Sequence, residues 1–167
     1  MRTTKTIGIT SVGIIVGIAA LSYSFLSSEG LSAREKPSNF EYAIANYALG
    51  LSIPSEAKRL KSPASSTLEV LMDAKRCYSD NCAVCHGIDG TGKTNTASGL
   101  SPEVPDLHAE HIQKLTDGDM FYIIKNGVRY TGMPGWDFRD EQIWNLVLLI
   151  RQFDRDNASP PGSRKPK

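Results

Sequence analysis

The pentapeptide Cys82-Ala83-Val84-Cys85-His86 decides how this chain folds. It has the pattern C-x-x-C-H, which is the attachment signature of a covalently bound haem. Two thiols three positions apart can add across the two vinyl groups on one edge of a porphyrin, and the adjacent imidazole can then bind the iron. The sequence therefore predicts one haem c, with Cys82 and Cys85 as the attachment sites and His86 as the proximal iron ligand.

Two other kinds of site use a C-x-x-C pair, and the flanking sequence favours neither. A zinc site needs a second Cys or His pair at ligand spacing, but Cys77 lies too close to Cys82, and His108 and His111 lie in a short polar run. A redox dithiol is typical of a β-α-β pattern, whereas the surroundings here look helical. We expect both histidines to face solvent, and Cys77 to be a small buried hydrophobic side chain.

Helix signals lie on both sides of the motif. The run Ser66-Thr67-Leu68-Glu69 fits a capping box that begins a helix ending near Ser79, and this helix carries the cysteines to the haem edge. Residues 108–115 form a predicted short helix. Thr116 is the predicted N-cap of a helix that ends at Asn126-Gly127. Apolar residues at helical spacing predict a last helix over 138–153.

A methionine in a loop is the predicted sixth ligand of the iron. Met133 lies between Gly132 and Pro134, outside any helical stripe. The proline makes the loop rigid and the glycine leaves access, which suits a thioether held against iron. Met72 and Met120 lie in helical stripes, so we expect both in the core.

A proline segment follows the glycine-rich loop after the motif. Its carbonyl groups can accept a hydrogen bond from the outward N–H of His86, which would fix the orientation of the ring. Pro105 is the first candidate for this role and Pro102 is the second.

The N-terminal region has an uncharged apolar run from Ile7 to Leu26, preceded by Arg2 and Lys5. About 20 apolar residues are enough to cross a bilayer as a helix, and the positive-inside rule keeps the N-terminus in the cytoplasm. Residues 1–28 are therefore a predicted single-pass anchor in the cytoplasmic membrane, with the haem domain in the periplasm. A cleavable signal peptide, cut near Leu31-Ser32-Ala33, is the alternative, although the run exceeds a usual signal core of about 7–15 residues.

The rest of the chain divides into a connector, a domain and a tail. Residues 29–65 are the predicted connector, in which 40–51 form an amphipathic helix and 55–60 a second short helical stretch. The apolar face of the first helix could pack on the haem domain, lie on the membrane or meet a partner. Residues 66–156 form the predicted haem domain, and 157–167 are expected to be a disordered tail.

Together these features resemble a class I cytochrome c over roughly 66–153. The resemblance rests on the N-terminal helix with Tyr78, Cys82-x-x-Cys85-His86-Gly87, Pro105-Asp106-Leu107, Gly132-Met133-Pro134 and the apolar C-terminal helix. It implies an all-α fold around one haem, with terminal helices that cross. Residues 53–63 also look like a stretch of membrane-anchored bacterial monohaem cytochromes. The chain departs from the family at Ala74, where glycine is common, and at Arg139, where a capping residue is common.

The predicted function is electron transfer rather than catalysis, because a haem with both axial positions filled by protein passes single electrons. We expect redox partner proteins and no small-molecule substrate. The net charge of only +1 gives no indication of a nucleic-acid partner. The protein is expected to be an anchored carrier or the cytochrome subunit of a respiratory dehydrogenase or oxidase complex. The alternative is a haem peroxidase or gas sensor in which Met133 leaves the iron, although no distal catalytic histidine is evident.

Overall fold

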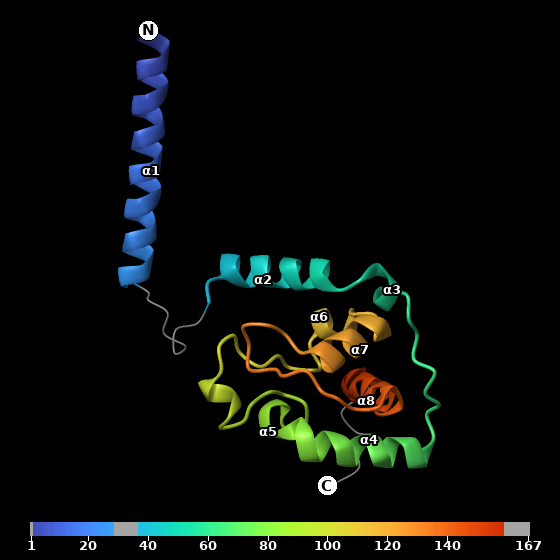
Figure 1. The fold of residues 1–167 in the computed structure, drawn as a ribbon. Coiled ribbons are helices and arrows are strands. Elements are labelled where there is room, and N and C mark those ends of the chain that lie inside the picture. Colours follow the sequence, from blue (N-terminus) through green and yellow to red (C-terminus); the bar gives the residue numbers. More distant parts are fainter. Residues whose placement is uncertain (1, 29–36, 159–167) are drawn as a thin grey trace. The chain divides into compact units, whose positions relative to one another are not determined.

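The computed structural model describes residues 2–28 and 37–158, with side chains over 12–24, 26–27 and 37–153. The chain divides into two compact units, Met1–Glu35 and Lys36–Lys167. Every regular element among the described residues is a helix (Figure 1), which confirms the predicted all-α class. The predicted tail lies outside the described residues, apart from 157 and 158, which belong to the last helix.

The first unit contains one helix, α1 (Arg2–Ser28). Large apolar side chains project into solvent from its described part; they are Val12, Ile14, Ile15, Val16, Ile18, Leu21 and Leu26. Among the residues with described side chains, none of the helices has the length and apolarity needed to cross a bilayer. The membrane anchor therefore stays a prediction.

The second unit contains the remaining helices; each predicted helix is present, α7 with the predicted ends and the others with shifted ends. In chain order they are α2 (Asn39–Ser52), α3 (Ser55–Lys58), α4 (Leu68–Asn81), α5 (Ala83–His86), the 3-10 helix η1 (Ala97–Gly99), α6 (Glu110–Gln113), α7 (Asp117–Asn126) and α8 (Asp140–Ala158).

Side-chain caps determine where the principal helices begin. Thr116 is the N-cap of α7, as predicted, and it forms a reciprocal capping box with Asp119. The capping box predicted at Ser66 is wrong, because α4 begins one residue later, with Thr67 as N-cap and its hydroxyl accepting from the Val70 amide at 3.2 Å. This shift places Glu69 at the second helical position instead of the third, out of register for the reciprocal bond.

The core forms where α4 packs on α8, and α7 packs on α8 beside it. Ala74 of α4 is 1% exposed at this contact, so the small side chain lets the two helices approach closely. The fully buried side chains opposite are those of Ile143, Leu146 and Val147. Burial of each such side chain contributes roughly 1.5–3 kcal/mol, so the α4–α8 contact stabilises the whole unit.

The two helical methionines have different environments. Met120 of α7 is buried in the core, as predicted. Met72 of α4 is 56% exposed, so its predicted core position is wrong. It lies two residues before Ala74, which places it about 200° around the helix from the face that packs on α8.

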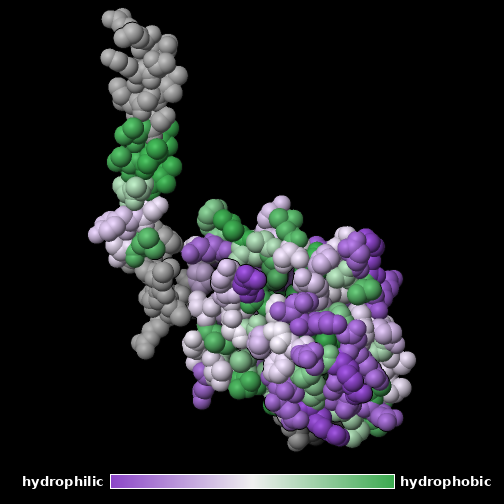
Figure 2. Space-filling model, in the orientation of Figure 1, coloured by the Kyte–Doolittle hydropathy of each residue, from purple (hydrophilic) through white to green (hydrophobic). Residues whose placement is uncertain are grey.

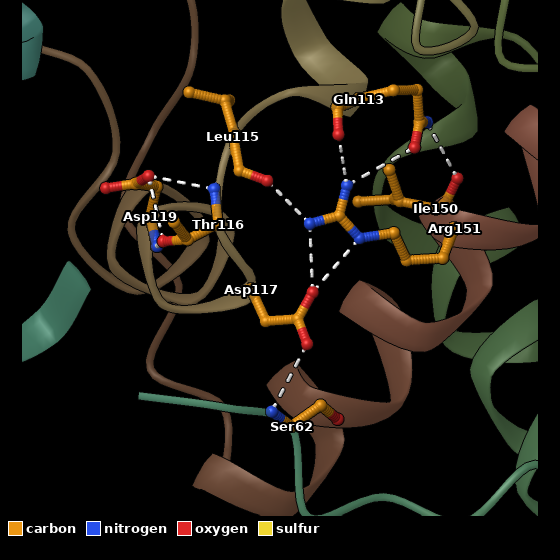
Figure 3. A network of polar contacts seen from close by, with 8 residues as sticks. All are labelled: Ser62, Gln113, Leu115, Thr116, Asp117, Asp119, Ile150 and Arg151. Atoms are coloured by element: carbon orange, nitrogen blue, oxygen red, sulfur yellow. Dashed lines mark hydrogen bonds and ion pairs between the residues drawn. The ribbon is translucent and has the colours of Figure 1, made fainter. Parts of the chain in front are cut away.

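Arg151 of α8 links this helix to the chain before α7 (Figure 3). Its guanidinium donates to Asp117 Oδ1 at 2.9 and 3.0 Å, to the Gln113 carbonyl at 2.6 Å and to the Leu115 carbonyl at 2.5 Å. The Ser62 amide donates to the other Asp117 oxygen at 3.4 Å. The Asp117 carboxylate therefore joins the connector to Arg151 of α8, whose planar fork matches its acceptors.

Helix α3 packs on α7 at Gly118, which has no room for a side chain. A Cβ atom there would lie 1.8 Å from the Ala57 carbonyl oxygen and 3.2 Å from the Leu60 oxygen. Ile53, just before α3, is also buried. The connector from Ile53 to Ser62 is therefore docked on the rest of this unit.

The variant Gly118→Ala is expected to destabilise the protein by about 1–3 kcal/mol, because the added methyl group displaces the α3 backbone. Gly50→Ala is the matched control: it is also a helical glycine, and a Cβ atom there meets nothing within 4 Å. The control should be neutral or gain up to about 1 kcal/mol from helix propensity. Urea unfolding followed by circular dichroism measures both, and equal effects would contradict the close contact of α3 with α7.

Candidate functional site

The predicted haem ligands Cys82, Cys85 and His86 lie on a single helical turn at the end of α4. Cys82 is the C-cap of α4 and the N-cap of α5, and its carbonyl accepts from the Cys85 and His86 amides at 3.1 and 2.9 Å. Positions i, i+3 and i+4 share one face of a helix. Neither thiol is in a disulfide. The turn therefore presents two unbonded thiols and an imidazole on the same side.

The carbonyl oxygens at the end of this turn all have hydrogen-bond donors. The Thr94 hydroxyl donates to the Val84 oxygen at 2.9 Å and lies 3.2 Å from the Cys85 oxygen. The Gly92 amide donates to the His86 oxygen at 2.8 Å, and the Tyr78 hydroxyl donates to the Gly87 oxygen at 2.8 Å. Because helix ends leave carbonyl groups without intrahelical partners, these bonds hold the turn in place.

Thr94 has a positioning role that the sequence did not indicate. Its hydroxyl oxygen also accepts from the Ala97 amide at 3.0 Å, so the same side chain holds η1 against α5. Its only sequence signal is a hydroxyl residue three positions before a helical amide, which is typical of many surface threonines.

The glycine-rich loop brings the predicted proline segment to His86. The Leu107 amide donates to the Gly90 carbonyl at 2.8 Å. A Cβ atom on Gly92, whose φ is +70°, would lie 2.7 Å from the Val104 oxygen and 3.2 Å from the Pro105 oxygen. Only glycine adopts this conformation at such a close approach without strain.

The imidazole of His86 is largely buried, and its environment matches a neutral ligand. Burial lowers the pKa of His86, and the nearby Pro105 backbone carbonyl opposes this shift. The Nδ1 atom is buried and has no hydrogen-bond partner among the described residues, so the Pro105 carbonyl lies near the ring without completing a hydrogen bond. Of the two candidate carbonyls, the structure places that of Pro105 at the ring.

Met133 lies in a loop that is tied to the end of α7. The Val128 amide donates to the Met133 carbonyl at 3.1 Å, and the Met133 amide donates to the Thr131 hydroxyl at 3.1 Å. Gly127 has a φ of +69°, and a Cβ atom on it would lie 2.7 Å from the Met133 oxygen. The methionine is partly buried against the core. The loop therefore has a fixed backbone at the residue predicted to bind iron.

The Met133 loop and the cysteine turn share a neighbour. A Cβ atom on Gly132 would lie 2.8 Å from both terminal carbons of Leu100, which directly follows η1. Because η1 packs on α5, the same segment contacts both predicted ligand-bearing regions.

The two remaining histidines have different environments. His111 is exposed, as predicted, and its Nε2 lies 3.5 Å from the Tyr42 hydroxyl. The prediction that His108 faces solvent is wrong. Its Nδ1 lies 2.7 Å from Asp106 Oδ1, and its ring packs against Phe153 at an interplanar angle of 53°, with centroids 5.1 Å apart. The aromatic neighbour comes from α8, 45 residues away, so local polarity gave no sign of it.

The other interpretations of the cysteine pair gain no support from the described residues. Burial raises the pKa of the Cys82 thiol to about 12, whereas a redox dithiol needs a lowered thiol pKa. No group of three or more His, Cys, Asp or Glu side chains in the described part of the chain is arranged to hold a metal ion. Cys77 is half-buried, and burial raises its pKa as well.

Comparison with known proteins identifies the domain. The model of the family described as cytochrome c oxidase, cbb3-type, subunit III matches residues 69–150. Residues 69–150 are a c-type cytochrome domain. This cytochrome domain therefore binds haem c covalently and transfers electrons. No curated protein matches the chain.

A solved structure supports the fold of the cytochrome domain. It is described as a Kuenenia stuttgartiensis reducing HAO-like protein complex, and it matches with a TM-score of 0.50 and 20% identity over 55% of this chain. The chain spans 46% of that solved chain. At this identity the likeness concerns the fold alone.

Removing the Thr94 hydroxyl tests how the cytochrome domain holds its cysteine turn. Thr94→Val is expected to cost about 1–3 kcal/mol, because it leaves carbonyl groups of α5 without a donor. Thr96→Val is the control, since Thr96 is exposed and makes no side-chain cap. Guanidinium unfolding followed by haem absorbance measures both variants. If Thr96→Val lowers the free energy of unfolding as much as Thr94→Val does, the positioning role assigned to Thr94 is contradicted.

Proposed function

We propose that the domain transfers single electrons through one haem c attached at Cys82 and Cys85, with His86 and Met133 as the axial ligands. The observation that carries this proposal is the helical turn that presents two unbonded thiols and a buried imidazole on one face. When bound, the haem iron supplies exchange between its ferric and ferrous states.

His86 is held as a neutral ligand by its surroundings. Burial favours the uncharged ring, and a neutral imidazole is the form that binds iron. The Pro105 carbonyl lies near the ring, where a hydrogen bond from Nδ1 would fix the orientation of the imidazole and increase its basicity. Because Gly92 has no side chain, the Pro105 carbonyl can approach the imidazole. The glycine-rich loop therefore influences the orientation and basicity of His86 indirectly.

Met133 supplies a thioether, which favours the ferrous state relative to a second imidazole. The hydrogen bonds at Val128 and Thr131 restrict the loop, so a thioether bound to iron would have little freedom to leave it. If His86 and Met133 both bind the iron, a haem held here would have no open position for a substrate. These restraints favour a carrier over a peroxidase or gas sensor.

We also propose that α1 anchors the protein in the cytoplasmic membrane, with the cytochrome domain on the periplasmic side. The helix has 27 residues, which at 1.5 Å per residue gives about 40 Å, more than the roughly 30 Å of a bilayer core. Its apolar side chains from 12 to 26 project outward, and Arg2 and Lys5 precede the apolar run. The anchored protein serves redox partner proteins, either as a free carrier or as a subunit of a respiratory complex.

The variant Met133→Ala tests the axial ligand. Oxidised wild-type protein should show the weak near-infrared charge-transfer band of a sulfur–iron bond. The variant should lose this band, bind CO when reduced, and fall in potential by on the order of 0.1 V, within the range of about 0.8 V that axial ligands cover.

The buried Met120 provides the control for this experiment. Met120→Leu should keep the band and change stability by less than about 1.5 kcal/mol, as for a volume-conserving core substitution. Loss of the band in the Met120 variant and its retention in the Met133 variant would reverse the assignment. Rapid CO binding by the wild-type protein would favour the gas sensor or peroxidase instead.

The anchor is tested by fractionation of cells that produce the full chain. The cytochrome should sediment with membranes, resist carbonate washing, and be exposed to protease added on the periplasmic side. Recovery of a soluble mature chain that begins after residue 33 would decide for a cleaved signal peptide.

A further inference from the structure

Helix α2 has two faces with different environments. One face carries Tyr42 and Leu49, which are seven residues apart and therefore lie on the same side. The Tyr42 hydroxyl lies 3.5 Å from His111 Nε2 at the start of α6, and Leu49 is half-buried. This face is turned toward the cytochrome domain.

Helix α2 has a capped start and is tied to the rest of the unit at its C-terminal end. Ser38 and Glu41 form a reciprocal capping box at the start of the helix. At the other end, the Lys58 ammonium donates to the Gly50 carbonyl at 2.6 Å, and Ile53 is buried. The end of α2 is therefore held against α3, while its first turns touch α6 through Tyr42.

The opposite face of α2 is apolar and has no partner among the described residues. It consists of four large side chains spaced four, three and four residues apart, and we call these residues the outer stripe: Phe40, Ile44, Tyr47 and Leu51. They are between 52% and 73% exposed. At 100° per residue the outer stripe lies about 180° from the face with Tyr42 and Leu49. Figure 2 shows hydrophobic side chains on the surface over α2.

This arrangement is the reverse of an ordinary surface helix, whose apolar side packs on its own domain. A contiguous exposed apolar patch on a soluble domain marks a surface that is covered in the working protein. The outer stripe includes two aromatic residues, and aromatic side chains are enriched where a helix meets the boundary between water and lipid.

We propose that the outer stripe of α2 lies in the headgroup region of the membrane that holds the protein, and this rests on the proposed membrane attachment. Helix α2 is then an interfacial helix, parallel to the bilayer surface, with its apolar side chains between the lipid headgroups.

The distribution of charge favours a lipid surface over other occupants. From 38 to 64 the segment has three basic residues, Lys58, Arg59 and Lys61, against Glu41 and Glu56. All three cations are exposed beside the end of α2. The matched domain from 69 to 150 has more acids than bases. Anionic headgroups therefore attract the α2–α3 side and repel the rest of the unit.

The length of chain between α1 and α2 agrees with this placement. Helix α1 ends at Ser28 and α2 begins at Asn39. The ten residues between them reach at most about 36 Å. An anchor that ends at the membrane surface therefore keeps α2 within reach of the headgroups. A tethered segment needs only weak affinity to stay bound, because the tether raises its effective concentration at the surface.

The placement also gives the cytochrome domain an orientation. In Figure 1, α6, α7 and α8 lie between α2 and the α4–α5 end of the unit. With α2 on the membrane, the cysteine turn is directed away from the bilayer. A redox partner then reaches this part of the domain from the aqueous side.

Spin labelling of the full chain in liposomes of phosphatidylethanolamine and phosphatidylglycerol tests the inference. Single cysteines replace Ile15 in α1, Tyr47 in the outer stripe and Leu68 in α4, each in a Cys77→Ala background. Leu68 is the matched control, because it is also a highly exposed apolar residue at 76%. Collision rates with oxygen and with a water-soluble nickel complex measure the depth of each label.

The label at position 47 is expected to show several-fold lower access to nickel than the label at 68, with high access to oxygen. The label at 15 should be deeper still. The double variant Phe40→Ser/Leu51→Ser should raise nickel access at position 47 toward that at 68, while haem absorbance and resistance to carbonate stay unchanged.

Equal nickel access at 47 and 68 would overturn the inference. A second result would also overturn it. If both oxygen and nickel have low access to position 47, and this shielding disappears when the protein is diluted with lipid, the outer stripe contacts a second copy of the protein instead. Position 15 decides the anchor separately: a water-exposed label there contradicts the proposed attachment, whatever the result at 47. The Cys77→Ala protein without an added cysteine should take no label, and labelling at 82 and 85 would instead contradict the proposed haem attachment.

Discussion

The close packing of α4 on α8 at Ala74 is the contact on which the rest of the structure depends. Helix α4 ends at the cysteine turn, so the position of α4 on α8 also fixes the position of both thiols and of His86. Tyr78 lies on the same helix, one turn after Ala74, and its hydroxyl donates to the Gly87 carbonyl. A larger side chain at 74 would separate the helices and move the turn away from the core.

Helix α8 also holds the segment that follows Pro105. The Gln113 amide group donates to the Leu107 carbonyl at 2.7 Å and to the Ile150 carbonyl at 3.1 Å. The Arg151 guanidinium holds the Gln113 backbone. The segment that brings the Pro105 carbonyl to His86 is therefore tied to α8 by polar contacts, while α4 is tied to it by apolar ones. One helix thus sets both the ligand and the group that orients it.

Features that depend on neighbours in the sequence could be predicted. The cysteine turn, the Thr116 cap and the helical periodicities all arise from relations between residues three or four positions apart. The environments of Met72 and His108 could not be predicted. The first depends on which face of α4 packs on α8, and the second depends on the position of Phe153, which is distant in the sequence. Periodicity likewise identified the apolar face of α2 without indicating that it points away from the domain. The role of Thr94 depends on a loop returning to α5, for which the sequence has no local signal.

The most direct test of the site is the mass spectrum of the full chain, produced in cells that have a haem-attachment system. Attachment at Cys82 and Cys85 predicts a polypeptide that carries one haem after denaturation. It also predicts a single proteolytic peptide that contains both cysteines and the bound haem. A polypeptide of unmodified mass, with free thiols at both positions and haem that acid acetone extracts, would contradict the proposed attachment.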